Sequence, residues 1–321
     1  MADKALSPEN ALLKTVFKAR AWDIYSRRLQ FLSATDQDSW ESVDFPLEIS
    51  LELTNSCNLR CIMCPVPNLK RERGFMDEPV FRKAVEEISH ESGFLFLPQG
   101  FGEALLHPKW ADFLSVAHSA GVSPVVVLTN GMLLAGKNLD AARRLTDVLI
   151  VTLDGSTAKT YESVRVNSSF EKVTGNIENV LKLRDAQKPH MVLRIIRMRD
   201  NDAEIESFRN FWERKISKGD VLQVSDCIDW AGSVAYRGVH ANKMNKARHA
   251  CRMLWKNLTV FHDGRVSPCC FDAEGELSVG HVLQQGLRDI WNGQPLRNLR
   301  DLHRKGHFHK IPLCAQCGNW L

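Results

Sequence analysis

Three cysteine thiols follow a predicted strand at short, fixed intervals and could together hold an inorganic cofactor. Cys57, Cys61 and Cys64 have the spacing C-x3-C-x2-C. They come directly after residues 47–53, whose alternating apolar and polar side chains predict a β-strand. Thiolates are the usual ligands of iron–sulfur clusters, and three of them would leave one iron of a four-iron cubane open to a small chelating molecule.

Zinc is the alternative occupant of this loop, and the three thiols could also be unconnected. Structural zinc sites have four ligands, usually in two closely spaced pairs, so three cysteines favour a cluster but leave zinc open. The chain has nine cysteines, an odd number, and they are grouped rather than spread. In a reducing compartment this grouping favours metal binding over disulfides.

Length, charge and hydropathy restrict the class of protein. The 321 residues suffice for one large domain or for a barrel with a small appendage. The net charge of +4 arises from mixed signs and gives no electrostatic case for nucleic acid. The sequence contains no run of 18 apolar residues, so it predicts no transmembrane helix. Residues 1–20 lack the apolar region of a secretory signal. We therefore expect a cytoplasmic protein with reduced thiols.

Residues 1–46 are expected to form an extension in front of the main domain. Apolar side chains recur at helical spacing within residues 11–31, with basic residues between them. This pattern predicts a helix packed on the main domain. A helix that binds a partner or a membrane surface is the alternative.

From residue 47 onward, predicted strands and helices alternate. Strands are expected at residues 47–53, 94–97, 125–128, 148–153, 191–198 and 221–225, with helices at residues 77–92, 108–120, 139–145, 170–184 and 204–215. Such alternation is typical of a parallel sheet with right-handed crossovers. Six units are too few for a closed eight-stranded barrel. We therefore predict an α/β fold, an open, partial (β/α)6 TIM-like barrel over residues 47–230.

Polar residues and glycines follow these strands at the end where ligands bind. In open parallel sheets and in barrels, ligands sit at the carboxyl ends of the strands. Each motif alone is a common turn, but together they define one expected site. In chain order after the cysteine loop, these residues are Gln99 to Glu103, Thr129 to Gly131, Thr152, Asp154, Gly155, Arg194, Arg197, Ser225, Asp226 and Cys227.

With these motifs the sequence resembles the radical S-adenosylmethionine (SAM) superfamily. The resemblance rests on the three cysteines, on Gly102-Glu103 at the family's Gly-Gly-Glu-type motif, and on Thr129-Asn130-Gly131. It covers about residues 47–230. It implies the partial barrel and a [4Fe–4S] cluster whose fourth iron binds the amino and carboxylate groups of S-adenosyl-L-methionine.

The resemblance also implies individual contacts to SAM. The matching positions are Met63 for adenine, Gly102 and Glu103 for the methionyl amine, Asn130 and Thr152 for the ribose, and Arg165 for the methionyl carboxylate. Two positions depart from the family pattern, because Phe101 replaces a glycine and Ala104 a proline. The fifth strand also lacks the Gly-x-Ile-x-Gly adenine motif of some relatives.

A second group of cysteines lies near the end of the chain. Its members are Cys251, Cys269, Cys314 and Cys317. A predicted hairpin with an Asp263-Gly264 turn separates the first two, and the last two form a C-x2-C pair. Four thiolates in this order fit a zinc ribbon or a second [4Fe–4S] cluster. The pattern resembles the Twitch domain, a shortened SPASM domain, which implies one auxiliary [4Fe–4S] cluster.

This resemblance completes the expected domain organisation. Residues 231–250, rich in Gly, Asn, Lys and His, are expected to be a linker. Residues 251–321 are expected to form the small auxiliary-cluster domain, with a β-hairpin and a helix at residues 286–292.

Two cysteines lie outside the expected ligand sets. Cys270 neighbours Cys269, and either of them could ligate the auxiliary cluster, although the spacing favours Cys269. Cys227, at the end of the sixth strand, is either a buried small apolar residue or a hydrogen-atom donor to a substrate radical.

Together these features predict a radical SAM oxidoreductase. SAM is cleaved to methionine and a 5′-deoxyadenosyl radical, the radical abstracts a hydrogen atom from the substrate, and the auxiliary cluster accepts the second electron. The expected substrate is a small molecule with a hydroxyl-bearing carbon, a sugar or an aminocyclitol. Arg194, Arg197 and Asp226 are candidates to bind it or to remove the hydroxyl proton. The expected reductant is a protein such as flavodoxin or ferredoxin.

Three alternatives stay open. The first is redox-neutral epimerisation, in which Cys227 or Cys270 returns a hydrogen atom to the substrate radical. The second is peptide modification, for which residues 1–46 look too short to form a leader-binding domain. The third is a non-enzymatic zinc-ribbon module on an α/β scaffold.

Overall fold

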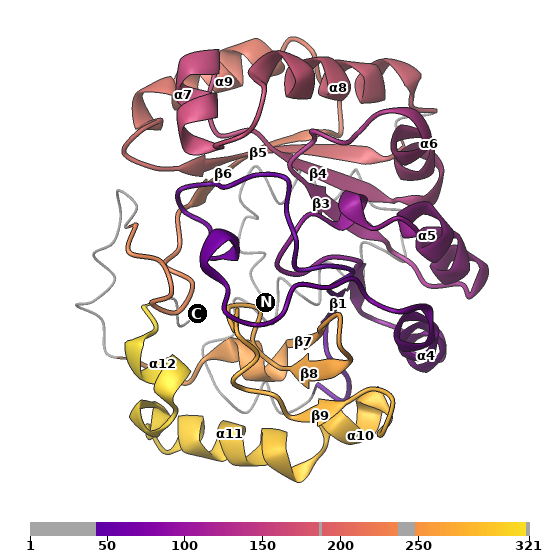
Figure 1. Ribbon diagram of the computed structural model, residues 1–321, viewed down its shortest axis with the longest axis vertical. Coiled ribbons are helices and arrows are strands. Elements are labelled where there is room, and N and C mark those ends of the chain that lie inside the picture. The colour runs from indigo at the N-terminus through magenta and orange to yellow at the C-terminus, as the bar shows by residue number, and fades with distance from the viewer. Residues whose placement is uncertain (1–42, 186–187, 237–247, 319–321) are drawn as a thin grey trace, which may run out of the picture.

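The computed structural model describes residues 43–185, 188–236 and 248–318 (Figure 1). The helix predicted within residues 11–31 lies outside the described residues, and so does most of the predicted linker at residues 231–250. Within the described ranges, no helix is long and apolar enough to cross a membrane.

Six parallel strands follow one another in chain order and form the framework of the barrel. They are β1 (Glu48–Leu51), β2 (Leu95–Leu97), β3 (Val126–Thr129), β4 (Val148–Thr152), β5 (His190–Arg197) and β6 (Val221–Asp226). β1 pairs with β2, and β3 to β6 pair in sequence. A bridge between Phe96 and Val125 joins the two sets. The predicted α/β fold with a partial (β/α)6 barrel is confirmed.

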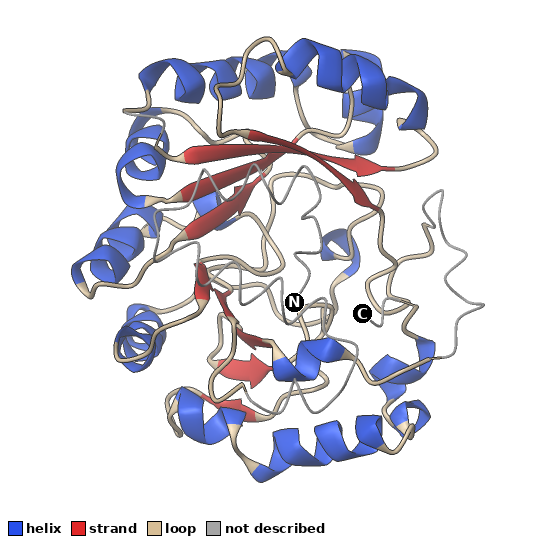
Figure 2. Ribbon diagram, turned by 180° about the vertical axis from the view of Figure 1, so that it is seen from behind, coloured by secondary structure: helices blue, strands red, loops and turns tan. Residues whose placement is uncertain are grey.

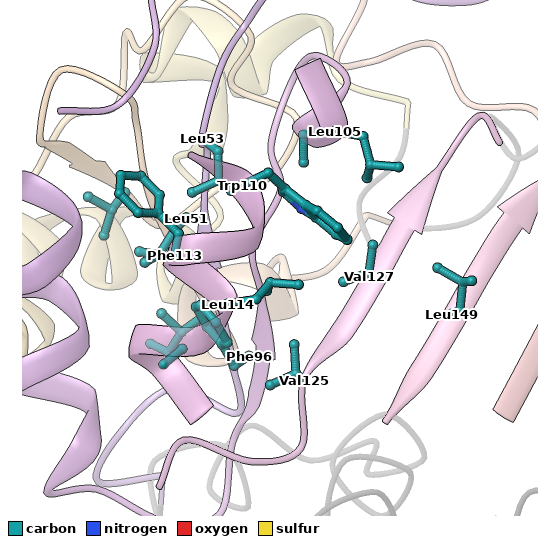
Figure 3. Close-up of a cluster of buried hydrophobic side chains, with 14 of the residues drawn as sticks. Leu51, Leu53, Phe96, Leu105, Trp110, Phe113, Leu114, Val125, Val127 and Leu149 are labelled. Atoms are coloured by element: carbon teal, nitrogen blue, oxygen red, sulfur yellow. The ribbon is translucent and has the colours of Figure 1, made fainter. Parts of the chain in front are cut away.

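Helices cover the outer side of these strands (Figures 1 and 2). They are α4 (Glu78–Ser89), α5 (Trp110–Ser119), α6 (Gly136–Leu145), α7 (Ala158–Val164), α8 (Phe170–Leu183) and α9 (Ile205–Trp212). Figure 3 shows one part of this interface, where Trp110 and Phe113 of α5 lie near Phe96 and Val127 of the strands. Five of these helices are confirmed. The sequence did not predict α7, because seven residues are too few for a clear helical period.

The inner face of the strands is apolar at its amino ends. Each of β2 to β6 contributes one buried side chain to a separate apolar cluster, made of Leu95, Val126, Val148, Val192 and Val221. Because side chains alternate between the two faces of a strand, residues an even number of positions further on also face this interior. The polar residues among them lie toward the carboxyl ends, where the site is expected.

The C-terminal segment extends the sheet of the barrel. β7 (Asn257–Val260) pairs in parallel with β1, and β8 (Arg265–Ser267) and β9 (Gly280–His281) follow in antiparallel order. The hairpin with its Asp263-Gly264 turn is confirmed. Its pairing with β1 was not predicted, because two strands so far apart in sequence carry no local signal for each other.

Helices and short turns complete the C-terminal part. The helices are α10 (Leu287–Trp291), α11 (Gln294–Arg304) and α12 (Pro312–Gln316). The predicted helix at residues 286–292 corresponds to α10.

Short 3-10 helices occur in both parts of the described chain. They are η1 (Val66–Asn68), η2 (Ala104–Leu106), η3 (Asp202–Glu204), η5 (Arg252–Trp255) and η6 (Phe308–Lys310).

Candidate functional site

Residues 57–64, the first cysteine loop, leave the carboxyl end of β1 and are held from two sides. The backbone N–H groups of Arg60 and Ile62 donate to carbonyl oxygens at the end of α7, at 2.9 and 3.1 Å. From the β2 side, the N–H of Glu103 donates to the Ser56 carbonyl at 2.9 Å. These bonds place the loop between the ends of β2 and α7.

The three thiols of this loop are buried or half-buried and lie within electrostatic reach of one another. Burial, with the nearby charges of Cys61 and Cys64, raises the pKa of Cys57 to about 12. Burial and the charge of Cys61 raise the pKa of Cys64 to about 11. The N–H of Leu59 points at the Cys57 sulfur, at 3.4 Å. Metal binding would therefore displace protons from these thiols, because thiolates are the ligands.

This donor set fits an iron–sulfur cluster. Across residues 43–185, 188–236 and 248–318, no three His, Cys, Asp or Glu side chains gather closely enough to hold one metal ion. A cubane makes a different demand, because each thiolate binds its own iron. Backbone and side-chain N–H groups already point at two of the sulfurs, as the outer partners of such ligands do.

Two glycines after β2 allow the β2 loop to pack on the β1 loop. Gly102 has φ +140°, and a Cβ there would collide with the carbonyl oxygens of Thr54 and Ser56. A Cβ at Gly100 would lie 2.5 Å from the Cβ of Glu52. In the structure the close approach is to the protein's own β1 loop.

Glu103 joins β2 to β3 inside the site. Its side chain is buried; Oε1 accepts a bond from the Thr129 hydroxyl at 2.8 Å, and Oε2 accepts one from the Asn130 N–H at 2.9 Å. Burial raises the pKa of this carboxyl. These bonds give Glu103 a role in holding the carboxyl end of β3, and its contact to a methionyl amine stays a prediction.

Asn130 and Thr152, the two residues predicted to contact the ribose, lie at the carboxyl ends of neighbouring strands. Asn130 directly follows β3, and Thr152 is the last residue of β4. Asn130 donates from Nδ2 to Asn58 Oδ1 at 3.0 Å and lies 3.8 Å from the Cys57 sulfur. Thr152 is buried and is in register with Arg194 of β5. Asn130 therefore stands beside the first cysteine loop, and Thr152 faces the barrel interior.

Arg165 is held against Cys61 by a buried ion pair. Its Nε and Nη2 donate to Oδ2 of Asp154 at 2.7 and 2.6 Å, and its Nη1 lies 3.7 Å from the Cys61 sulfur. Burial opposes the charged form, but the carboxylate of Asp154 and the charge of Cys61 raise the pKa of Arg165 above its ordinary value. A fixed positive charge therefore sits beside the first cysteine loop.

Arg194 and Arg197 of β5 lie on opposite faces of the strand. Three positions separate them, and side chains alternate along a strand. Arg194 is on the interior face with Val192, and its Nε donates to Gln223 of β6 at 2.9 Å. Arg197 is on the other face and lies 3.4 Å from Asp202 in an ion pair. The sequence analysis treated both as one substrate-binding set, but the strand separates them.

The remaining two residues predicted to take part in catalysis, Asp226 and Cys227, lie at the end of β6. Asp226 is exposed and is in register with Arg197. Cys227 is half-buried, and burial together with the charge of Asp154 raises its pKa to about 11. At neutral pH this side chain is therefore a protonated thiol.

The second cysteine group forms a second cluster of buried thiols. Burial and the charges of Cys251 and Cys317 raise the pKa of Cys314 to about 12. Burial, with charges that include Cys251, also raises the pKa of Cys269. Cys251 thus lies within electrostatic reach of both Cys269 of the hairpin and Cys314 of the C-x2-C pair, although these residues are far apart in the sequence.

Cys269 and Cys270 differ in their surroundings. The Cys269 sulfur accepts the N–H of Phe271 at 3.4 Å. Burial raises the pKa of Cys270 to about 12, and the charges with the largest effect on it are Lys256, which lowers it, and Glu48, which raises it; these two residues form a buried ion pair. The N–H donor favours Cys269 as the ligand, in agreement with the spacing, and the assignment stays a prediction.

Trp230, which no sequence motif indicated, contacts the segments that carry the two cysteine groups. Its indole N–H donates to the carbonyl of Met63 at 3.0 Å. Its ring packs against Phe271, beside Cys269 and Cys270. A single tryptophan after a strand carries no recognisable motif, so no sequence signal was present.

Two sequence models of known families match the chain. The model of the radical SAM superfamily matches residues 51–211, about half of the chain. The model of an iron-sulfur cluster-binding domain, SPASM, matches residues 251–318. The first range contains the first cysteine loop, and the second contains all four members of the second group.

Curated relatives include enzymes with different substrates. Mycofactocin maturase MftC of Mycobacterium tuberculosis (strain H37Rv) is 23% identical over 319 residues, which cover 87% of this chain and 77% of that protein. The S-adenosyl-L-methionine-dependent 2-deoxy-scyllo-inosamine dehydrogenase of Niallia circulans is 24% identical over 281 residues, 84% of this chain and 92% of that protein.

Solved structures share the fold. BtrN in complex with AdoMet and 2-DOIA has a TM-score of 0.61 at 20% identity, with 86% of this chain and 94% of that chain covered. Streptococcus suis SuiB bound to precursor peptide SuiA has a TM-score of 0.67 at 12% identity, with 85% and 69% covered. At these identities the likeness is one of fold.

Proposed function

Because this chain belongs to the radical SAM superfamily, we propose that it oxidises a hydroxyl-bearing carbon of a sugar or an aminocyclitol to a carbonyl. The family and its SPASM domain bring three cofactors: SAM, a SAM-binding [4Fe–4S] cluster and an auxiliary iron–sulfur cluster. The oxidation removes one hydrogen atom from carbon, one proton from the hydroxyl group and one electron. Each of these needs an acceptor on the enzyme.

The first cysteine loop supplies the acceptor of the hydrogen atom. Cys57, Cys61 and Cys64 would hold the SAM-binding cluster, which when bound delivers the electron that converts SAM to methionine and a 5′-deoxyadenosyl radical. Arg165 stays positive beside Cys61 and would attract the methionyl carboxylate. Asn130, beside Cys57, would donate to the ribose.

The carboxyl ends of β4 to β6 supply the substrate side. Arg194 faces the barrel interior beside Thr152 and would bind the hydroxyl oxygen atoms of the substrate. Asp226 ends β6 at the barrel opening but is in register with Arg197, on the face opposite Arg194, so the hydroxyl proton would reach its exposed carboxylate by way of solvent water.

The second cysteine group supplies the acceptor of the electron. Cys251, Cys269, Cys314 and Cys317 would hold the auxiliary cluster, and four thiolates leave no open iron, so the cluster would take the electron without binding the substrate. The observation that carries the proposal is that Cys251 lies within electrostatic reach of both Cys269 and Cys314, while Trp230 contacts Met63 of the first cysteine loop and Phe271 beside Cys269. The dehydrogenase among the relatives supports the same substrate class.

The test is anaerobic incubation with SAM, a reductant and candidate polyols or aminocyclitols. We expect one carbonyl product for each 5′-deoxyadenosine formed. 5′-Deoxyadenosine without a two-electron oxidised product, when a polyol or aminocyclitol is turned over, would overturn the proposal. A modified peptide as the only product would instead support peptide modification.

Epimerisation is a second candidate that one observation favours. Cys227 directly follows β6 at the carboxyl end of the strand, and its half-buried side chain is a thiol, the form that can donate a hydrogen atom. Incorporation of solvent deuterium at an inverted carbon, with no carbonyl product, would identify this reaction.

A further inference from the structure

The turn after β6 holds an unusual backbone. Trp230 and Ala231 have φ of +51° and +56°, and Gly232 follows with φ +84°. Left-handed backbone is uncommon for a residue as bulky as tryptophan and strains the chain. Such strain persists only where the surrounding contacts hold it, so the contacts of this turn are informative.

One side of the Trp230 indole contacts the SAM-binding side of the protein. Its N–H donates to the carbonyl of Met63, the residue that directly precedes Cys64, at 3.0 Å. Its ring lies 5.6 Å from the ring of Phe101 in the β2 loop. Trp230 also packs on the apolar cluster that includes Val66. Cys57 and Cys64 pack on the same cluster.

The other side of the same turn contacts the auxiliary side. The Trp230 ring meets the Phe271 ring edge to face, with centroids 5.9 Å apart. A Cβ at Gly232 would lie 3.3 Å from Gln316, between Cys314 and Cys317. A Cβ at Gly318 would lie 2.9 Å from the carboxylate of Asp229. The turn therefore touches segments that carry both cysteine groups.

We propose that Trp230 is a positioning residue that couples the two iron–sulfur sites, so that packing around the second cysteine group sets the affinity of the first site for SAM. The coupling passes from Phe271 through the indole to the Met63 carbonyl, and so fixes the backbone on which Cys64 and the expected adenine contact sit. This inference rests on the proposed function, in which SAM binds beside Met63. Because coupling between two sites is reciprocal, SAM in turn orders the Phe271 segment.

The first test is the dissociation constant of SAM for the anaerobically reconstituted protein. Trp230→Phe keeps a ring but removes the N–H, and we expect SAM to bind about three- to tenfold more weakly, the usual effect of one neutral hydrogen bond. Iron per chain should not change. Trp291→Phe is the matched control, because Trp291 is buried and donates the same kind of bond, to the Val43 carbonyl at 3.1 Å. SAM should bind this variant within twofold of the parent chain.

The second test measures hydrogen exchange of backbone amides. If Trp230 only stabilised the fold, SAM would not change the exchange of amides near the second cysteine group. In the parent protein, SAM should slow exchange of the backbone amides of residues 269–273. In Trp230→Phe at saturating SAM, this protection should be lost. Phe271→Leu removes the ring contact from the other side and should also weaken SAM binding, and its effect should not add fully to that of Trp230→Phe.

The outcomes separate this inference from the proposed function. A parent chain that binds no SAM would refute the function. A parent chain that binds SAM, together with a Trp230→Phe chain that binds it equally well, would refute the coupling. If Trp230→Phe loses iron, the test depends on Phe271→Leu. Unchanged SAM affinity in Phe271→Leu would also refute the coupling.

Discussion

Arg71 and Glu52 form a bidentate ion pair that is almost completely buried, with N–O distances of 2.6 and 2.5 Å. Glu52 follows β1, and Arg71 lies in the segment after the first cysteine loop. The backbone N–H of His262, in the C-terminal hairpin, donates to Glu52, and the ring Nδ1 of His262 lies 3.2 Å from the same carboxylate oxygen. Arg71 Nε donates to the Ala273 carbonyl at 2.6 Å. One charge pair therefore ties the barrel, the cysteine loop and the C-terminal part together.

Removing the charge of Glu52 should destabilise the protein strongly. In Glu52→Gln the guanidinium of Arg71 stays buried without its counter-ion, a change that typically costs about 3–5 kcal/mol. Urea unfolding of the variant and the parent checks this. Glu178→Gln is the control, because Glu178 pairs with Lys215 at the exposed surface and should contribute no more than about 1 kcal/mol. Equal stability of Glu52→Gln and the parent would contradict the assigned role.

The contribution of Glu52 should also depend on pH. Burial opposes its charge, but the bonds from His262 and Arg71 lower its pKa below the ordinary value of 4.5. A lowered pKa in the folded state means that the stabilisation is complete above about pH 4.5 and is lost as pH falls through the folded pKa. The stability difference between parent and Glu52→Gln should therefore be constant between pH 6 and 8 and shrink below about pH 4.5. A difference that grew on acidification would have the wrong sign.

Iron analysis should separate the two cysteine groups. The reconstituted parent chain should hold about eight irons, as expected for two cubanes. Cys57→Ser and Cys314→Ser should each reduce this to about four, and the Cys314→Ser chain should still bind SAM. Cys270→Ser is the control for Cys269→Ser, and only the latter should lose iron. Stoichiometric zinc in place of iron would show that the second cysteine group is a zinc ribbon and does not hold an iron–sulfur cluster.

The two arginines of β5 should differ in their effect on turnover. Arg194 faces the barrel interior, so Arg194→Ala should lower kcat/KM for substrate by about tenfold or more, the usual effect of losing a charged hydrogen bond. Arg197 lies on the opposite face with Asp202, so Arg197→Ala should stay within about twofold. Both variants should bind SAM like the parent. The reverse order of effects would show that the substrate contacts the other face.

Cys227 should behave as an unreactive thiol. With a pKa of about 11, its thiolate fraction at pH 8 is on the order of a hundredfold below that of an ordinary cysteine. Alkylation of Cys227 in the reconstituted protein, followed by mass spectrometry, should be correspondingly slow and should accelerate about tenfold per pH unit. If the reaction is a dehydrogenation, Cys227→Ala should retain turnover. Loss of turnover in Cys227→Ala, with solvent deuterium at the inverted carbon in the product of the parent, would instead support epimerisation.

The local pattern of the chain was sufficient for the barrel and for the cysteine loops. Alternating strands and periodic helices such as α4 are local features, and parallel strands in chain order place their carboxyl ends at one edge. The short spacing of Cys57, Cys61 and Cys64 confines them to one loop. The different faces of Arg194 and Arg197 also follow from their spacing, and the sequence analysis overlooked them.

Contacts between distant segments were decided only by tertiary structure. β7 lies beside β1, Arg71 reaches Glu52 and Ala273, and Trp230 connects Met63 with Phe271, although the partners are far apart along the chain. The sequence alone determined which residues could bind clusters and where the strands would deliver them. The packing of the C-terminal hairpin on β1 decided where the second cysteine group lies relative to the first, because long-range pairing depends on surfaces that exist only once the barrel has formed.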